Sequence, residues 1–246
     1  MKNALISSLL LASSTMAATW DYKKNGADWV DVYAACGKEN QSPIDLLTSW
    51  DVEEAKEDAF NKLYTNQKTA IPITWNGHTS QIAVNKTTQD LQTFHSNYAK
   101  EELGATDRFT GVQFHFHHGS EHTIDGKRHD LEMHTVHLAS ETLNDVGYAA
   151  MGIMFSVEDY TADLSETQLA VINAFFDGLS WDETGEVTAD LILYGDLMEM
   201  VDSNNRWIYK GSVTTPPCAT YVYWNVMSTI YPVTKKHLEL FKTQLN

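Results

Sequence analysis

Two stretches of alternating side chains, joined by a turn dipeptide, constrain the fold of this chain more than any other feature. Residues 113–117 read Gln-Phe-His-Phe-His, and residues 130–137 contain a second alternation around His134. Asp125-Gly126 between them is a strong signal for a two-residue β-hairpin turn. Because successive side chains of a strand point to opposite faces, the hairpin would have one histidine-rich face and one face of phenylalanines that points into a core.

The histidine-rich face brings together three candidate metal ligands. His115 and His117 share a face of the first strand, and His134 lies on the second strand. If the pairing set by the turn continues along both strands, His117 and His134 are direct cross-strand neighbours with Cβ atoms about 5 Å apart. Three imidazoles can occupy three positions around a tetrahedral zinc ion and leave the fourth for water. The spacing therefore predicts a zinc site.

Two further polar residues strengthen this prediction. Gln113 and Glu132 each precede a candidate ligand by two residues and share its strand face. Metal-bound imidazoles usually donate their second N–H to an acceptor of this kind. A single His-x-His arises by chance on a half-exposed strand, but three histidines with two acceptors favour a metal site over a purely structural role.

A second metal-binding interpretation stays open at this point. His115-x-His117, followed after three residues by Glu121, also fits the core motif of cupins. In that interpretation Glu121 is a ligand, the metal is iron or manganese, and the fold is a cupin barrel.

The rest of the chain predicts one mainly β domain with peripheral helices. No repeat, low-complexity tract or Pro/Gly/Ser-rich linker divides it, and the sheet could be a sandwich, a barrel or an open sheet. Alternating or apolar runs predict strands at residues 81–84, 111–118, 131–138, 149–155, 190–194, 207–209 and 221–227. Helical periodicity predicts helices at residues 53–63, 166–176 and 235–245.

The charge balance excludes one class of partner. The 246 residues contain 17 Lys and Arg against 33 Asp and Glu, which gives a formal net charge of −16 at pH 7. A surface this negative repels phosphate backbones, so we expect no nucleic-acid partner.

The N-terminus has the pattern of a secretory signal peptide over residues 1–17. Lys2 provides a short basic region, Ala4–Ala12 is apolar, and Ala17 suits a signal-peptidase site. The expected mature chain is residues 18–246, and no later apolar run in it is long enough for a membrane helix. We therefore expect a protein secreted to the extracellular space or the periplasm, with no membrane span.

Export makes a disulfide permissible for the two cysteines of the chain, Cys36 and Cys218. A bond between them would tie the start of the domain to its late region. Two buried free thiols are the alternative, which the residues alone leave open.

Several motifs together resemble α-class carbonic anhydrases. They are Gln113-Phe-His-Phe-His117, Ser120-Glu-His-Thr123, Leu131-Glu-Met-His-Thr-Val-His137, Ser212-Val-Thr-Thr-Pro-Pro217, Trp20-Asp-Tyr22, Gln41-Ser-Pro-Ile44, Trp75-Asn-Gly-His78 and Trp224. The short loop between His117 and Glu121 is similar to that of secreted bacterial, plant and protist members. The resemblance implies a central twisted, mostly antiparallel sheet, a zinc ion in a conical cleft, and reversible hydration of CO₂ to bicarbonate by zinc-bound hydroxide.

The resemblance also implies roles for individual residues. His115, His117 and His134 hold zinc, and Gln113 and Glu132 orient the first and third of them. In catalysis, Thr214 accepts the hydrogen bond of the hydroxide and donates to Glu121, while His78 at the cleft mouth carries protons to buffer. The positions matching the CO₂ pocket are Val136, Ala150, Val213, Thr215, Val222 and Trp224. Those matching the polar cleft wall are Tyr22, Asn76 and Gln81.

Four further expectations come from the same resemblance. Family members often link the positions of Cys36 and Cys218 by a disulfide. They are inhibited by sulfonamides and small anions, and they are monomers or homodimers. The family normally continues past the position of Asn246 with a strand that supplies a carbonyl near the second zinc ligand, so residues 18–246 would lack that strand.

A related binding or storage protein with little turnover is the alternative function, although such proteins usually lose zinc ligands.

Overall fold

The computed structural model describes residues 20–24, 26–50, 61–75, 78–84, 92–179 and 186–244. The expected signal peptide and Asn76 lie outside these residues. Within them, no helix has the length and apolar character needed to cross a bilayer.

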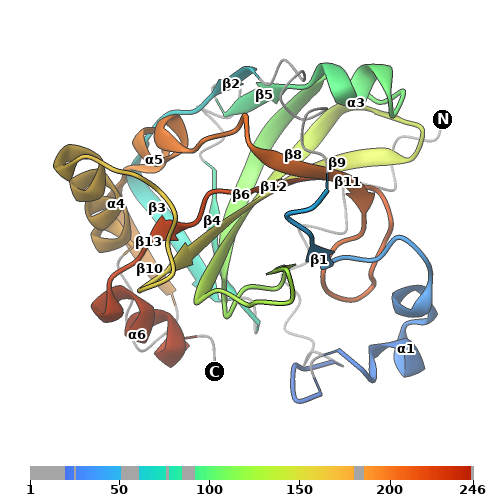
Figure 1. The fold of residues 1–246 in the computed structure, drawn as a ribbon, viewed down its shortest axis with the longest axis horizontal. Coiled ribbons are helices and arrows are strands. Elements are labelled where there is room, and N and C mark those ends of the chain that lie inside the picture. The colour runs from blue at the N-terminus through green and yellow to red at the C-terminus, as the bar shows by residue number, and fades with distance from the viewer. Residues whose placement is uncertain are drawn as a thin grey trace.

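A large twisted sheet forms the centre of the molecule (Figure 1). Its main strand order is β10-β3-β4-β6-β8-β9-β12-β11, and neighbours pair antiparallel except β9 with β12, which are parallel. These strands are β3 (Gln67–Trp75), β4 (Ser80–Ala83), β6 (Arg108–His118), β8 (Leu131–Leu143), β9 (Val146–Ser156), β10 (Glu186–Ile192), β11 (Arg206–Gly211) and β12 (Val222–Met227). The expected mainly β, mostly antiparallel fold is confirmed, and the sheet is open.

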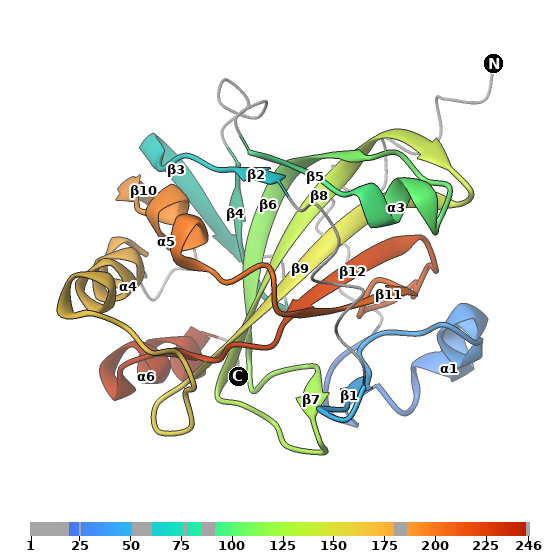
Figure 2. The same cartoon turned by 45° about the horizontal axis from the view of Figure 1, so that its top comes forward.

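Short strands and helices surround this sheet. The short strands are β1 (Asp45–Leu46), β2 (Asn61–Leu63), β5 (Thr93–His95), β7 (Thr123–Ile124) and β13 (Tyr231–Pro232). The helices are α1 (Trp29–Val32), a 3-10 turn η1 (Ala34–Gly37), α3 (Asn97–Glu101), α4 (Glu166–Gly178), α5 (Tyr194–Met200) and α6 (Lys235–Gln244). Figure 2 shows α4, α5 and α6 on one side of the molecule, and α1 with β1 on the other.

The phenylalanines of β6 point into the main core, as the alternation predicts. Phe114 stacks on Tyr194 of α5 with ring centroids 4.5 Å apart, and Phe116 packs 4.8 Å from Phe241 of α6. Both phenylalanines are fully buried. Helices α5 and α6 cover this face of the sheet. The opposite face of β6 and β8, which carries the histidines, lines the cleft described below.

Most of the predicted elements are confirmed, and three are corrected. Helix α5 begins at Tyr194, so the strand predicted over 190–194 ends at Ile192. The helix predicted over 53–63 is wrong at its end, because residues 61–63 form β2; its first residues lie outside the described chain. Strand β3 was not predicted, since Pro72 and its polar first residues weaken the strand pattern.

The predicted register of the histidine hairpin is wrong. Asp125 and Gly126 do form the turn, both with positive φ, and Ile124 pairs with Lys127 as expected. The segment between His118 and Ile124 is two residues longer than the segment between Lys127 and Leu131 on the other side of the turn. His134 therefore lies opposite His115 rather than His117. A shift of two residues keeps every side chain on its face, and the three histidines still share one surface.

The disulfide between Cys36 and Cys218 is confirmed. Its S–S distance is 2.03 Å, and it joins η1 to the loop that follows Pro217. Beside it, the Gln41 side chain donates to the Cys218 carbonyl, and the backbone N–H of Ser42 donates to Ser212 Oγ at 2.9 Å. The early segment thus fixes the loop that carries Thr214.

Breaking this bond should lower the free energy of unfolding by about 2–5 kcal/mol, because it closes a loop of 182 residues in the unfolded chain. Urea unfolding of the oxidised protein, the reduced protein and a Cys36→Ser/Cys218→Ser double variant measures the difference. Equal stabilities, or two thiols that react with iodoacetamide in the native non-reduced protein, would contradict the prediction.

Candidate metal centre

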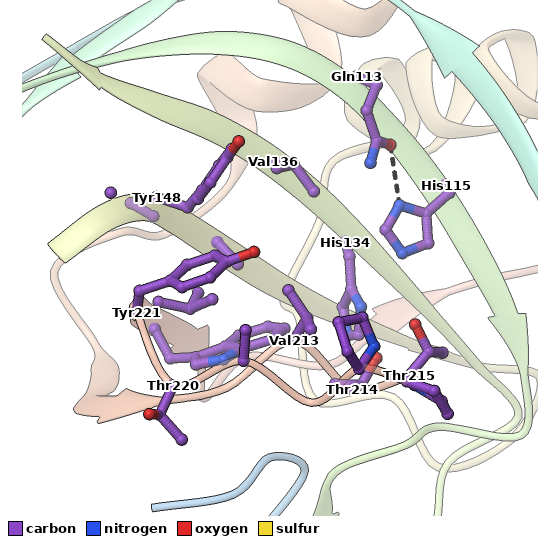
Figure 3. Close-up of a pocket in the computed structure, with 18 of the residues that line it drawn as sticks. Gln113, His115, His134, Val136, Tyr148, Val213, Thr214, Thr215, Thr220 and Tyr221 are labelled. Carbon is purple, nitrogen blue, oxygen red and sulfur yellow. Dashed lines mark hydrogen bonds between the residues drawn. The ribbon is translucent and has the colours of Figure 1, made fainter. Parts of the chain in front are cut away.

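The structure brings the three predicted ligands together on the cleft face of the sheet. His115 and His117 project from β6, and His134 projects from the neighbouring β8. Each offers one ring nitrogen, and these three nitrogens lie within 4.8 Å of one another. Figure 3 shows His115 and His134 facing the same space. The arrangement provides three converging imidazole donors.

The second ring nitrogens of two candidate ligands, His115 and His134, are hydrogen-bonded to the predicted acceptors. Nδ1 of His115 donates to Gln113 Oε1 at 2.9 Å, and Nε2 of His134 donates to Glu132 Oε1 at 2.8 Å. These bonds leave Nε2 of His115 and Nδ1 of His134 as lone-pair donors. Nε2 of His117 is buried and has no hydrogen-bond partner within the described chain. An unpartnered buried nitrogen between two such donors fits a metal ion.

The electrostatics of His115 and His117 suit a cation. Burial lowers the pKa of His115 to about 3 and holds the pKa of His117 well below its usual range. Both rings are therefore neutral at physiological pH and can donate a lone pair. Neutral imidazole ligands leave the charge of a bound dication undiminished.

Glu132 is the centre of a buried hydrogen-bond network that sequence reasoning captured only in part. Burial opposes its ionisation, but His122 and His134 hold the pKa of Glu132 well below its usual range. Its carboxylate accepts from His122 Nδ1 at 2.7 Å and from the backbone N–H groups of Glu121 and His122. The carboxylate is thus fully engaged, and its role is to fix the His134 ring. The bond to His122 depends on a loop geometry that no local pattern indicates.

Glu121 lies beside the histidines and faces Thr214. Its Oε1 is 3.4 Å from His117 Nδ1, and the Thr214 and Tyr22 hydroxyls hydrogen-bond to its carboxylate. Burial raises the pKa of Glu121 to about 8, and the two hydroxyls act in the opposite direction. The open sheet is not a cupin barrel, so the cupin interpretation of Glu121 is wrong.

The loop that carries Thr214 is held by bonds to rigid elements. The Trp224 indole on β12 donates to the Ser212 carbonyl at 2.9 Å, and the backbone N–H of Ser212 donates to Ser42 Oγ at 3.1 Å. Thr214 itself is almost fully buried. Its hydroxyl is therefore fixed relative to the three histidines.

The cleft above the histidines has a volume of about 700 Å³. The predicted pocket and wall residues that line it are Tyr22, His78, Gln81, Val136, Ala150, Val213, Thr215, Val222 and Trp224. Sequence reasoning missed Tyr148 and Tyr221, which also line it. Strand alternation could have indicated Tyr148, because it shares a face with Ala150.

His78 lies at the cleft wall and stacks on Trp20. The two ring centroids are 3.6 Å apart and the rings are tilted by 14°. The imidazole is partly exposed, and burial lowers the pKa of His78 below its usual range. Its position therefore connects the cleft with solvent.

Known proteins similar to this chain share its fold. A family model described as eukaryotic-type carbonic anhydrase matches residues 24–246. Carbonic anhydrase 6 of Bos taurus is 28% identical over 258 residues, which cover 96% of this chain and 75% of that protein. The α-carbonic anhydrase structure from Photobacterium profundum has a TM-score of 0.63 at 25% identity and covers 92% of both chains. The Thermovibrio ammonificans α-carbonic anhydrase, solved with the inhibitor sulfanilamide, has a TM-score of 0.65 at 24% identity and covers 94% of this chain and 92% of that one.

Proposed function

Because the chain belongs to the eukaryotic-type carbonic anhydrase family, we propose that it catalyses the zinc-dependent, reversible hydration of CO₂ to bicarbonate and a proton. The observation that carries this proposal is the convergence of His115, His117 and His134, with the outer nitrogens of two of them already hydrogen-bonded. The alternative of a binding or storage protein is weaker, since such relatives usually lose ligands and this chain has all three.

The three histidines would hold zinc through Nε2 of His115, Nε2 of His117 and Nδ1 of His134. A zinc ion there would acidify water, to a pKa of about 7 in carbonic anhydrases generally, so that hydroxide is available near neutral pH. Gln113 and Glu132 keep the rings of His115 and His134 in the orientation and tautomer that this ligation needs.

Thr214 and Glu121 would orient the nucleophile. The Thr214 hydroxyl would donate its only proton to an ionised Glu121 carboxylate, so that its oxygen could only accept a further hydrogen bond. An attacking hydroxide must then direct its own proton at Thr214 and a lone pair into the pocket. A positively charged ion nearby would favour the ionised form of Glu121 that this geometry requires.

The apolar side of the cleft would receive CO₂. Val136, Val213 and Trp224 line it next to His134, whose ring centroid is 4.8 Å from that of Trp224. CO₂ is neutral and has little affinity for polar groups, so an apolar surface that excludes water favours it over water.

His78 would transfer the proton that each hydration releases. An imidazole, even with its pKa lowered from the usual 6.5 as that of His78 is, accepts a proton from a group of pKa about 7 far better than bulk water does. His78→Ala should therefore lower kcat several-fold in dilute buffer and leave kcat/KM for CO₂ nearly unchanged. Stopped-flow measurements with and without added imidazole test this. Rescue by imidazole supports the role, whereas an equal loss in kcat/KM without rescue contradicts it.

Metal analysis together with a CO₂-hydration assay tests the proposed function itself. One zinc ion per chain with turnover supports it. Zinc without turnover would favour the binding or storage alternative, and a metal other than zinc would overturn the assignment.

We also propose that the protein is secreted, because structural disulfides such as Cys36–Cys218 persist in oxidising compartments. Inhibition by sulfonamides is expected from the similar Thermovibrio ammonificans enzyme.

A further inference from the structure

A glycine of the central sheet lies directly beside the carboxylate of Glu132. Gly152 of β9 is paired with His134 of β8 on one side and with Val226 of β12 on the other. Paired residues of neighbouring strands share a face of the sheet, so a side chain at Gly152 would project on the histidine-bearing face. The φ angle of Gly152 is not positive, so the backbone itself does not require a glycine here.

A side chain at this position would collide with Glu132. A Cβ atom on Gly152 would lie 2.8 Å from Glu132 Oε1 and 3.3 Å from a methyl carbon of Val226. Ordinary van der Waals contacts of a Cβ atom are 3.4–4 Å long. The carboxylate oxygen would therefore have to move away, whereas Val226 would have to yield much less.

The Glu132 carboxylate cannot move without losing hydrogen bonds. Its Oε1 accepts from His134 Nε2 at 2.8 Å and from His122 Nδ1 at 2.7 Å, and its Oε2 accepts from two backbone N–H groups. The other nitrogen of His122 is hydrogen-bonded to the Tyr209 hydroxyl at 2.7 Å, which fixes that ring as well. Glu132 and His122 are fully buried, and buried charge-assisted hydrogen bonds are costly to break.

Displacement of this carboxylate would reach the metal site through His134. The bond to Glu132 fixes the His134 ring so that Nδ1 is free to bind a metal ion. Metal ligands must be held within about 0.5 Å of their productive positions by such supporting contacts. The space beside Gly152 is therefore part of what orients the third imidazole.

We propose that Gly152 is a positioning residue of the metal site, because its lack of a side chain leaves the space from which Glu132 holds His134 for zinc. The inference rests on the proposed function, since zinc is the ion whose binding is measured. It goes beyond that function by giving β9 a role in metal affinity.

The zinc affinity of Gly152→Ala tests this proposal. Competition with a chromophoric chelator measures the dissociation constant without an activity assay. We expect zinc to bind about 10–100-fold more weakly than in the parent protein, the usual cost of disturbing a group that orients a ligand. Gly147→Ala is the matched control on the same strand, because a Cβ atom there would come no closer than 3.6 Å to its neighbours. It should bind zinc as the parent protein does.

Two double variants separate displacement of the carboxylate from general crowding. In a Glu132→Ala background, Gly152→Ala should weaken zinc binding by no more than about twofold, because no carboxylate remains to be displaced. A Val226→Ala background removes the other close contact but leaves Glu132 in place. There, Gly152→Ala should weaken zinc binding as much as it does in the parent protein.

Proton NMR of the metal-free protein provides a measurement that needs neither zinc nor activity. The ring N–H groups of His122 and His134 that donate to Glu132 should give downfield, slowly exchanging resonances in the parent protein and in Gly147→Ala. In Gly152→Ala the His134 resonance should move upfield or disappear while circular dichroism stays native.

The possible failures are distinguishable. If the parent protein does not bind one zinc ion per chain, the proposed function is wrong, and the NMR comparison alone decides whether Gly152 positions Glu132. If the parent protein binds zinc but Gly152→Ala binds it equally well and keeps both resonances, the role of Gly152 is wrong. A loss of affinity that Val226→Ala restores, or that persists in full with Glu132→Ala, would also overturn it.

The double variants decide the case in which Gly152→Ala does not fold. Recovery of the fold in the Glu132→Ala background would support a collision with the carboxylate. Failure to fold in that background as well would overturn the proposal.

Discussion

Replacing His134 with alanine should abolish stoichiometric zinc binding and, with it, nearly all CO₂ hydration. Two imidazoles rarely retain a catalytic zinc ion, and the substitution also removes the ring that Glu132 orients at 2.8 Å. The measurement is zinc per chain after dialysis against a weak chelator, combined with stopped-flow CO₂ hydration. Glu132→Gln keeps all three ligands and should weaken zinc binding by only about 10–100-fold.

A matched control for this variant lies on the paired strand. His118→Ala removes a partly exposed imidazole next to His117, on the opposite face of β6 from the cleft. It should keep one zinc per chain and near-normal activity. Unchanged zinc content in a folded His134→Ala protein, as judged by circular dichroism, would refute the ligand assignment.

The histidine face could be predicted from the sequence because strand alternation is a local property. Gln113, His115 and His117 share a face whatever the strand pairs with. The register could not be predicted, since the two additional residues between Gly119 and the turn change it without changing any alternation. The error did not affect the site, because a shift of an even number of residues keeps the faces.

Features that depend on contacts between distant segments could not be predicted from the sequence. Strand β3 is defined by pairing with β4 and β10, and its Pro72 argues locally against a strand. The bonds of His122 to Glu132 depend on how the loop after Gly119 folds back. Tyr221 lies outside the strands, so its position in the cleft follows from the loop after Cys218 rather than from any periodic pattern.

Thr214→Ala should reduce kcat/KM for CO₂ about 100-fold and leave zinc content unchanged. The variant keeps all three histidines but loses the hydroxyl that, in the proposed mechanism, accepts from the nucleophile and donates to Glu121. Loss of orientation at a reacting centre costs about this much in rate. Stopped-flow assays, zinc analysis and thermal unfolding of the same preparations separate a catalytic loss from a loss of metal or fold.

Thr214→Ser is the discriminating control for this prediction. Serine keeps the hydroxyl that we propose links the nucleophile to Glu121 and removes only a methyl group, so its kcat/KM should stay within a few-fold of the parent protein. Both variants should keep the fold, because the loop is fixed by Ser42 and Trp224 through backbone groups of Ser212 that neither substitution changes. A lowered unfolding temperature would instead indicate a structural role of the Thr214 side chain. Equal activities of the alanine and serine variants would show that the hydroxyl takes no part in orienting the nucleophile.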